Sequence, residues 1–132
     1  MEHIAIIKRP FSTLLFSGEK TIESRWSKNK IAPYKKIKIG DIVWIKETAK
    51  PITYKATVKR VEFYQLNENV FENIYKNYGK EICMDKFDNL ESYKQKKYCT
   101  LIWFDNLKKV KPIIAPKSYG TGWLQVKDIK KN

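Results

Sequence analysis

The sequence predicts a single α+β domain, residues 1–132, built on a small curled sheet or open β-barrel. Short apolar segments with strand periodicity recur along the chain, and one acidic stretch with helical periodicity lies between them. In addition, residues 53–66 have the pattern of one long strand whose apolar phase slips at Lys59-Arg60, which is what a β-bulge produces. Long, bent strands of this kind help to close small barrels.

The N-terminal elements are predicted to be a strand and a short helix. Residues 2–7 carry apolar side chains on both faces, which favours a strand that is covered on both sides. Pro10 is typical of the first position of a helix, and Phe11 and Leu15 share one stripe of that helix. Gly18 is well placed to end it.

The helix leads directly into Gly18–Trp26, a turn followed by a strand. Side chains alternate between the faces of a strand, so Glu23 and Arg25 stand side by side on one face, whereas Ile22 marks the other face as the core side. Alternation places Lys20 with Ile22, but as the first strand residue it can also point to the mouth of a cleft. The two charges are either a structural ion pair or the polar centre of a binding site. The two interpretations are compatible if Glu23 pairs with Arg25 while both contact a ligand.

The remaining strands follow from alternation and from turn residues. A polar, basic loop is expected at 27–38, with Ile31, Tyr34 and Ile37 as its apolar anchors. The other strands are predicted at 42–47, 98–104 and 107–114, with a glycine turn and a last strand within 118–126.

The acidic middle of the chain is predicted to be helical. Apolar residues recur every four positions from Leu66 to Tyr78. Asn67 can cap the start of this helix, and Gly79 fits its end. A second short helix is expected at 89–97.

The net charge of +13 is unevenly distributed along the chain. Residues 1–60 carry 14 basic and 5 acidic side chains and residues 94–132 carry 10 and 2, whereas residues 61–93 carry 3 and 7. A uniform bias toward lysine would not gather the acids in one segment. If the two ends meet in space, they form a basic surface that suits nucleic acid or a nucleotide-like ligand. A solvated, lysine-rich surface without a partner is the alternative.

Several kinds of chemistry are disfavoured by the composition. Cys83 and Cys99 have no partner at metal-ligand spacing and are expected to be buried packing residues. Because His3 is the only histidine, we expect no zinc site of the usual kind and no Ser-His or Cys-His mechanism. We also expect no other metal and no cofactor. No apolar run approaches the roughly 20 residues that span a membrane. We therefore expect a cytoplasmic protein without membrane contact, and a monomer by default.

Four residues are candidates for ligand contact on their local chemistry alone. Lys8, Arg9 and Ser12 lie at the N-terminal end of the first helix, where free backbone N–H groups favour anions. Trp123 follows a glycine turn, and it either belongs to the core or stacks on a base.

Three features then occur together. The chain contains Gly-x-Lys-x-x-Glu-x-Arg at Gly18, Lys20, Glu23 and Arg25, then a Gly40-Asp41 strand start, and late in the chain Pro116-Lys117-Ser118 followed by Trp123. This combination, from residue 4 to about residue 126, resembles the ASCH domain of the PUA-like superfamily. The resemblance implies a PUA-like small open β-barrel of about five or six mostly antiparallel strands with flanking short helices. It also implies a cleft beside the motif strand that binds RNA or modified nucleosides.

The resemblance also assigns ligand-binding residues. The motif carries over onto Lys20, Glu23 and Arg25, and the basic junction before Pro10 carries over onto Lys8. The C-terminal part of the pattern carries over onto Ser118 and Trp123.

Some ASCH proteins are similar to small amidohydrolases that deacylate acetylated cytidine with a Lys, Thr and Glu set. Lys20 matches that lysine, but Glu23 stands where the threonine falls, and Glu68 or Glu72 is the nearest candidate for the distant glutamate. Other ASCH proteins are described as ribonucleases, whereas this motif has no histidine nearby to serve in acid–base catalysis.

We therefore expect a non-catalytic module that binds RNA or a modified nucleotide in a cleft beside the motif strand. The alternative is a small hydrolase, either an amidohydrolase on acylated cytidine-type nucleosides or a ribonuclease. In that case Lys20 and Glu23 are the catalytic candidates. A protein-interaction module that uses the acidic helix is a third possibility.

Overall fold

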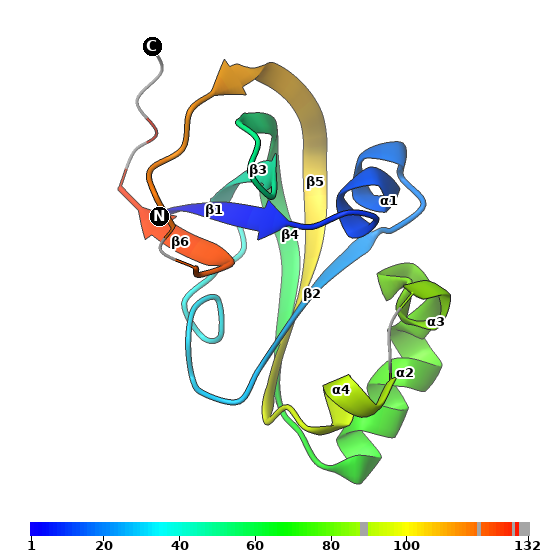
Figure 1. The fold of residues 1–132 in the computed structure, drawn as a ribbon. Helices are drawn as coiled ribbons and strands as arrows, with labels where there is room; N and C mark the ends of the chain where they lie inside the picture. The colour runs from blue at the N-terminus through cyan, green and yellow to red at the C-terminus, as the bar shows by residue number, and fades with distance from the viewer. Residues whose placement is uncertain (88–89, 119, 128, 130–132) are drawn as a thin grey trace.

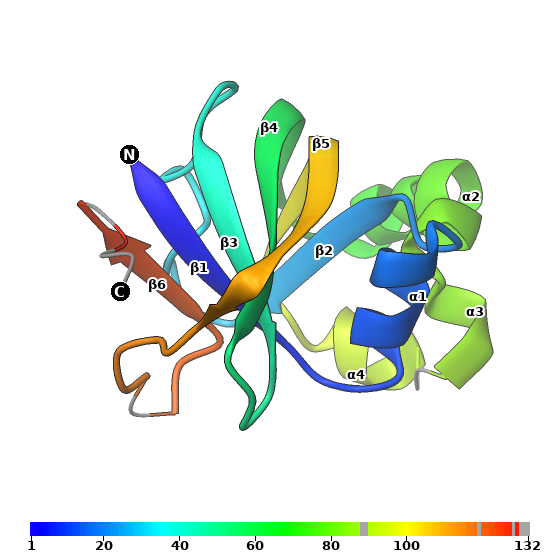
Figure 2. The ribbon, with the colours of Figure 1, turned by 90° about the horizontal axis from the view of Figure 1, so that it is seen from above.

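A single sheet of six strands curls into a half-barrel, and the helices gather at one side of it (Figures 1 and 2). The structure is a computed structural model and describes residues 1–87, 90–118, 120–127 and 129. The strands are β1 (Glu2–Ile7), β2 (Ile22–Ser27), β3 (Ile42–Glu47), β4 (Ile52–Gln65), β5 (Tyr98–Ile113) and β6 (Trp123–Val126). The helices are α1 (Phe11–Ser17), α2 (Glu68–Ile82), α3 (Met84–Phe87) and α4 (Leu90–Lys94). The predicted α+β class, with about six mostly antiparallel strands in a small open barrel and flanking short helices, is confirmed.

The strand order is β2-β5-β4-β3-β1-β6, so β2 and β6 are the edges of the sheet. The pair β1 and β3 is parallel, and all other pairs are antiparallel. The register of β4 against β5 shifts between Val58 and Arg60, which confirms the predicted bulge. Because a bulge bends its strand, β4 can follow the curvature of the half-barrel.

Alternate residues of the strands enter different hydrophobic clusters on the two faces of the sheet. Val43, Ile45 and Ile102 are fully buried in the interior of the half-barrel. On β5 the neighbouring residue Leu101 points the other way, into a second cluster with Ile22 and the apolar face of α2. The strand at 2–7 is covered on both sides as predicted, because its odd and even residues enter different clusters.

Several boundaries differ from the prediction. Pro10 is the N-cap of α1 and not its first helical residue, and Lys20 precedes β2. Gly79 does not end α2, because the buried Ile82 continues the apolar stripe and its burial outweighs the roughly 1 kcal/mol that a glycine costs inside a helix. The helix ends instead at Cys83, which adopts a left-handed conformation with φ 65°.

Other differences concern the loops. Ile31 is 59% exposed and is not an anchor of the 27–38 loop, whereas Tyr34 and Ile37 are buried. The two predicted strands at 98–104 and 107–114 form the single strand β5, in which Asn106 takes a positive φ. The short helix expected at 89–97 is α4, and Asn89 lies outside the described residues. None of the helices that the structure describes is long and apolar enough to cross a membrane.

The cap of α2 provides a test of the fold. Asn67 accepts a hydrogen bond from the Val70 backbone N–H at 2.9 Å, as its sequence position predicts. We expect Asn67→Ala to lower the free energy of unfolding by about 1 kcal/mol, because one N–H of the first turn loses its partner. Urea denaturation measures this loss. The control Asn73→Ala, on the exposed face of α2, should be neutral or slightly stabilising, and an equal loss in both variants would contradict the capping role.

Candidate ligand-binding cleft

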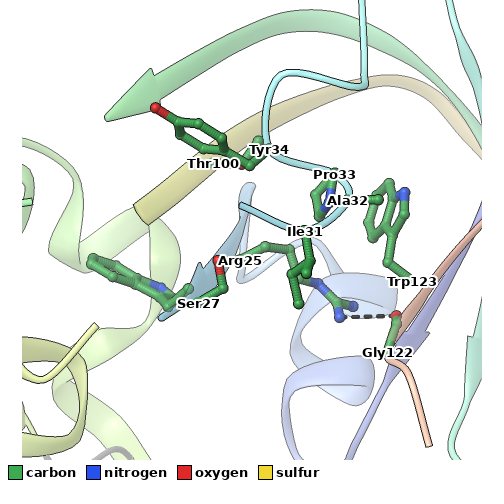
Figure 3. A pocket seen from close by; sticks show the side chains of 10 residues that line it. Arg25, Ser27, Ile31, Ala32, Pro33, Tyr34, Thr100, Gly122 and Trp123 are labelled. Atoms are coloured by element: carbon green, nitrogen blue, oxygen red, sulfur yellow. Dashed lines mark hydrogen bonds between the residues drawn. The ribbon is translucent and has the colours of Figure 1, made fainter. Parts of the chain in front are cut away.

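One side chain connects the two ends of the sheet. Arg25 lies on the edge strand β2, and its Nη1 donates to the carbonyl of Gly122 at 3.0 Å, just before the other edge strand (Figure 3). Its Nη2 donates to the carbonyl of Ile6 in β1 at 2.9 Å. The guanidinium therefore bridges the open side of the half-barrel.

The carboxylate of Glu23 holds that guanidinium in place. Arg25 Nε donates to Glu23 Oε2 at 2.9 Å, and Lys20 Nζ donates to Glu23 Oε1 at 2.5 Å. Lys20 and Glu23 are 4% and 2% exposed, so both charges are buried. Burial raises the pKa of Glu23, but the charges and hydrogen bonds of Lys20 and Arg25 lower that pKa by more, and the net shift is downward. We call these three side chains the charge cluster.

The predicted pairing of Glu23 with Arg25 is confirmed, and Lys20 is a third member of it. Lys20 lies on the side of Glu23 and not of Ile22, because it precedes β2 and strand alternation does not apply to it. Its backbone N–H donates to the carbonyl of Leu14, which fixes the turn between α1 and β2.

The charge cluster forms part of the wall of a cleft of about 530 Å³ beside β2. Of the residues predicted to contact a ligand, Lys8, Lys20, Glu23, Arg25 and Ser118 line this cleft. The chain supplies them from the end of β1, from the turn before β2, from β2 itself and from the segment before β6. The structure thus brings together residues from both ends of the sequence.

Arg9 and Ser12 do not line the cleft. The Ser12 hydroxyl donates to Glu47 Oε1 at 2.6 Å, and Arg9 Nε donates to the same oxygen at 2.9 Å. These two bonds, followed by one from Lys50, lower the pKa of Glu47 to about 2. The groups expected to attract an external anion therefore already hold a carboxylate of the protein.

Trp123 does not line the cleft, but it lines a smaller hollow of about 150 Å³ that shares Arg25 with it (Figure 3). The indole is 5% exposed, and the Arg25 guanidinium lies 5.2 Å from its centre. Its Nε1 donates to His3 Nδ1 at 3.0 Å, and His3 Nε2 lies 2.8 Å from Asp41 Oδ2. Because an indole N–H can only donate, His3 Nδ1 is an acceptor, and the imidazole is neutral with its proton on Nε2.

The cleft also contains residues that the sequence did not single out. Ser24, Thr48, Tyr93, Lys96 and Thr121 line it alongside the predicted set. Lys96 belongs to the lysine run at 94–97, for which the sequence suggests only non-specific phosphate contact or a solvated surface. The other four come from elements whose packing decides which side chains face the cleft. The described residues contain no group of three or more His, Cys, Asp or Glu side chains that could hold a metal ion.

The charge cluster predicts a large effect on stability. We expect Glu23→Gln to lower the free energy of unfolding by about 3–5 kcal/mol, because the buried Lys20 and the partly buried Arg25 would remain without their counter-charge. Urea denaturation at neutral pH measures the loss. The matched control Glu72→Gln removes an exposed carboxylate of α2 and should change stability by less than about 0.5 kcal/mol. A small effect of Glu23→Gln would contradict the importance of the cluster.

Glu47 predicts a dependence of stability on pH. Its pKa of about 2 in the folded protein lies below the ordinary value of 4.5. The stabilisation is therefore fully present above about pH 4.5 and is lost as the pH falls toward 2. We expect Glu47→Gln to destabilise the protein at neutral pH and to lose this effect progressively below pH 4.5. Urea midpoints across this range measure it, and a difference independent of pH would refute the assignment.

Comparison with known proteins gives a result at the level of structure only. No protein-family model matches the sequence, and no curated protein matches it. Solved structures do match. The structure of ASCH from Zymomonas mobilis has a TM-score of 0.63 at 18% identity, and the match covers 86% of this chain and 73% of that one.

A serine-to-alanine variant of the same Zymomonas mobilis protein matches over a longer stretch. Its TM-score is 0.70 at 15% identity, and the match covers 96% of this chain and 88% of that one. The resemblance that the Gly-x-Lys-x-x-Glu-x-Arg stretch indicated is thus supported by the course of the whole backbone. The chain has the fold of an ASCH domain.

Proposed function

We propose that the cleft beside β2 binds RNA or a modified nucleotide and that it does so without catalysing a reaction. The observation that carries this proposal is the buried charge cluster in the wall of a nucleotide-sized cleft. A volume of about 530 Å³ lies within the usual range for small-molecule sites.

The charges of the cleft favour a phosphate. Lys20 and Arg25 together carry one more charge than Glu23 neutralises. Lys20 and Glu23 are buried and Arg25 is partly buried, so water screens these charges less than it screens charges on the surface. Lys8 and Lys96 add two further positive charges to the cleft lining. Arg25 uses three of its five N–H donors within the protein, so its fork retains donors for an acceptor on a ligand.

Other parts of the lining suit a base and a sugar. Trp26 and Tyr93 meet edge to face with ring centres 4.7 Å apart, and both line the cleft. Aromatic side chains offer stacking surfaces to any base, and the Ser24 and Ser118 hydroxyls can exchange hydrogen bonds with polar groups of a sugar or base. The lining thus combines the two kinds of contact that a nucleotide needs.

The state of Glu23 favours binding over hydrolysis. A general base works best when its pKa lies near the working pH, whereas the pKa of Glu23 lies below its ordinary value. Both of its oxygens also accept hydrogen bonds from neighbouring cations. Such a carboxylate is suited to hold Lys20 and Arg25 in position. The alternative function is a hydrolase with Lys20 and Glu23 as catalytic residues, and it requires product to form from a bound ligand.

The test measures binding by calorimetry at low and moderate salt. The ligands are ribonucleoside monophosphates, N-acetylated cytidine and short single-stranded RNA. We expect at least one of these ligands to bind, with an affinity that falls as salt rises. Lys96→Ala should weaken binding about three- to tenfold, because it removes one phosphate contact. The control Lys59→Ala removes an exposed lysine of β4 that is not among the described residues lining the cleft, and it should leave binding unchanged.

The same mixtures are analysed by mass spectrometry for products. Deacylated cytidine or cleaved RNA that disappears in Lys20→Ala would replace the binding proposal with the hydrolase. Absence of binding to every probe would overturn both functions.

A further inference from the structure

A second hollow lies next to the cleft and carries three lysines. It has a volume of about 720 Å³ and is formed by the turn between β3 and β4 together with the segment that follows β5. Its cations are Lys46, Lys50 and Lys117, and we call this site the lysine hollow. Among the described residues that line it, none is acidic.

A shared carboxylate partly neutralises one side of the lysine hollow. Glu47 Oε2 lies 3.2 Å from Lys50 Nζ, and Glu47 Oε1 accepts from Arg9 and Ser12. Glu47 thus contacts two cations, and half or more of each of these cationic side chains is exposed. The arrangement leaves an excess of positive charge facing solvent.

The lysine hollow and the cleft are adjacent and share part of their lining. Ser118 lines both of them. In addition, Thr48 lines the cleft, and the residues that follow it in the chain, Ala49 and Lys50, line the hollow. A ligand that extends out of the cleft over Ser118 and Thr48 therefore enters the lysine hollow directly.

The surface of the hollow is not purely ionic. Ile114 is 90% exposed, and Pro51 and Pro116 line the hollow beside it. Apolar side chains among lysines suit a ligand that alternates charged and apolar parts, as the phosphates and bases of a nucleic acid strand do. A free phosphate would use the lysines alone.

We propose that the lysine hollow binds the phosphates of nucleotides adjacent to the one in the cleft, so that the ligand is single-stranded RNA of two or more nucleotides. This proposal rests on the proposed function, because the first nucleotide occupies the cleft. The strand is single where it enters, because a nucleotide seated in the cleft among Trp26 and Tyr93 cannot remain stacked and paired in a duplex.

The experiment compares cytidine monophosphate with single-stranded oligocytidylates of two to about eight nucleotides, a length within the usual range for single-strand sites. We expect affinity to rise with length and then to level off. In a variant with Lys46→Ala, Lys50→Ala and Lys117→Ala, the longer oligonucleotides should bind about tenfold or more weakly, and the slope of log K against log salt should become shallower by about 2. The monophosphate should bind this variant as it binds the original protein.

A control variant with Lys59→Ala, Lys76→Ala and Lys127→Ala changes the net charge equally and should not alter the length dependence. Circular dichroism checks that both variants are folded. Equal binding of monophosphate and oligonucleotides would overturn the lysine hollow as a binding site while leaving the proposed function intact. A further outcome would overturn it as well: inorganic polyphosphate binds with the same affinity as RNA, and Lys96→Ala does not change that affinity. The surface would then be a general polyanion site. Absence of all binding would overturn both proposals.

Discussion

The buried carboxylate of Glu23 is the group on which the cleft depends. It accepts hydrogen bonds from Lys20 and Arg25, and the three charges are stable in the protein interior only as a set. Burial of an ion pair is by itself weak evidence for stability, since taking charges out of water costs about as much as their attraction returns. The cluster therefore makes more sense as a device that fixes Arg25 and Lys20 in position than as a source of stability.

Arg25 uses that fixed position to join parts of the chain that the sheet leaves apart. Strands β2 and β6 are the two edges, and no strand pairing connects them. The guanidinium supplies the connection through the carbonyls of Ile6 and Gly122, and the cleft occupies the same opening. In a fully closed barrel, backbone hydrogen bonds would pair β2 with β6 and no such opening would exist. The half-barrel lacks these bonds, and a cleft with polar walls lies in their place.

Most of the fold follows from local patterns, whereas the site follows from them only in part. The bulge at Lys59-Arg60, the cap at Asn67 and the helix end at Gly18 were all predictable, because a short stretch of sequence determines each. The burial of Lys20 was not, since a lysine beside a turn is ordinarily solvated and only the fold brings it to Glu23.

The positions of Arg9 and Ser12, which do not line the cleft, could not be predicted for a similar reason. Their helix-terminal position predicted contact with a ligand anion, but in the structure their side chains contact Glu47, which lies 35 residues or more away in sequence. Contacts between distant segments have no local signature, and these decide which side chains line a cleft. This also explains why Lys96 and Thr48, which occupy unremarkable sequence positions, line the cleft with the motif residues.

Gly122, just before β6, lies very close to the Arg25 side chain of β2. A Cβ at Gly122 would lie 2.8 Å from Arg25 Nη1, so any larger residue there must displace the guanidinium. The next residue, Trp123, is anchored through its indole N–H to the buried His3, whose other nitrogen bonds to Asp41. This chain of bonds positions the Gly122 carbonyl that Arg25 needs. The side of the cleft opposite β2 is therefore fixed by the pairing of β1 with β6, and the site can form only when the first and last strands have come together.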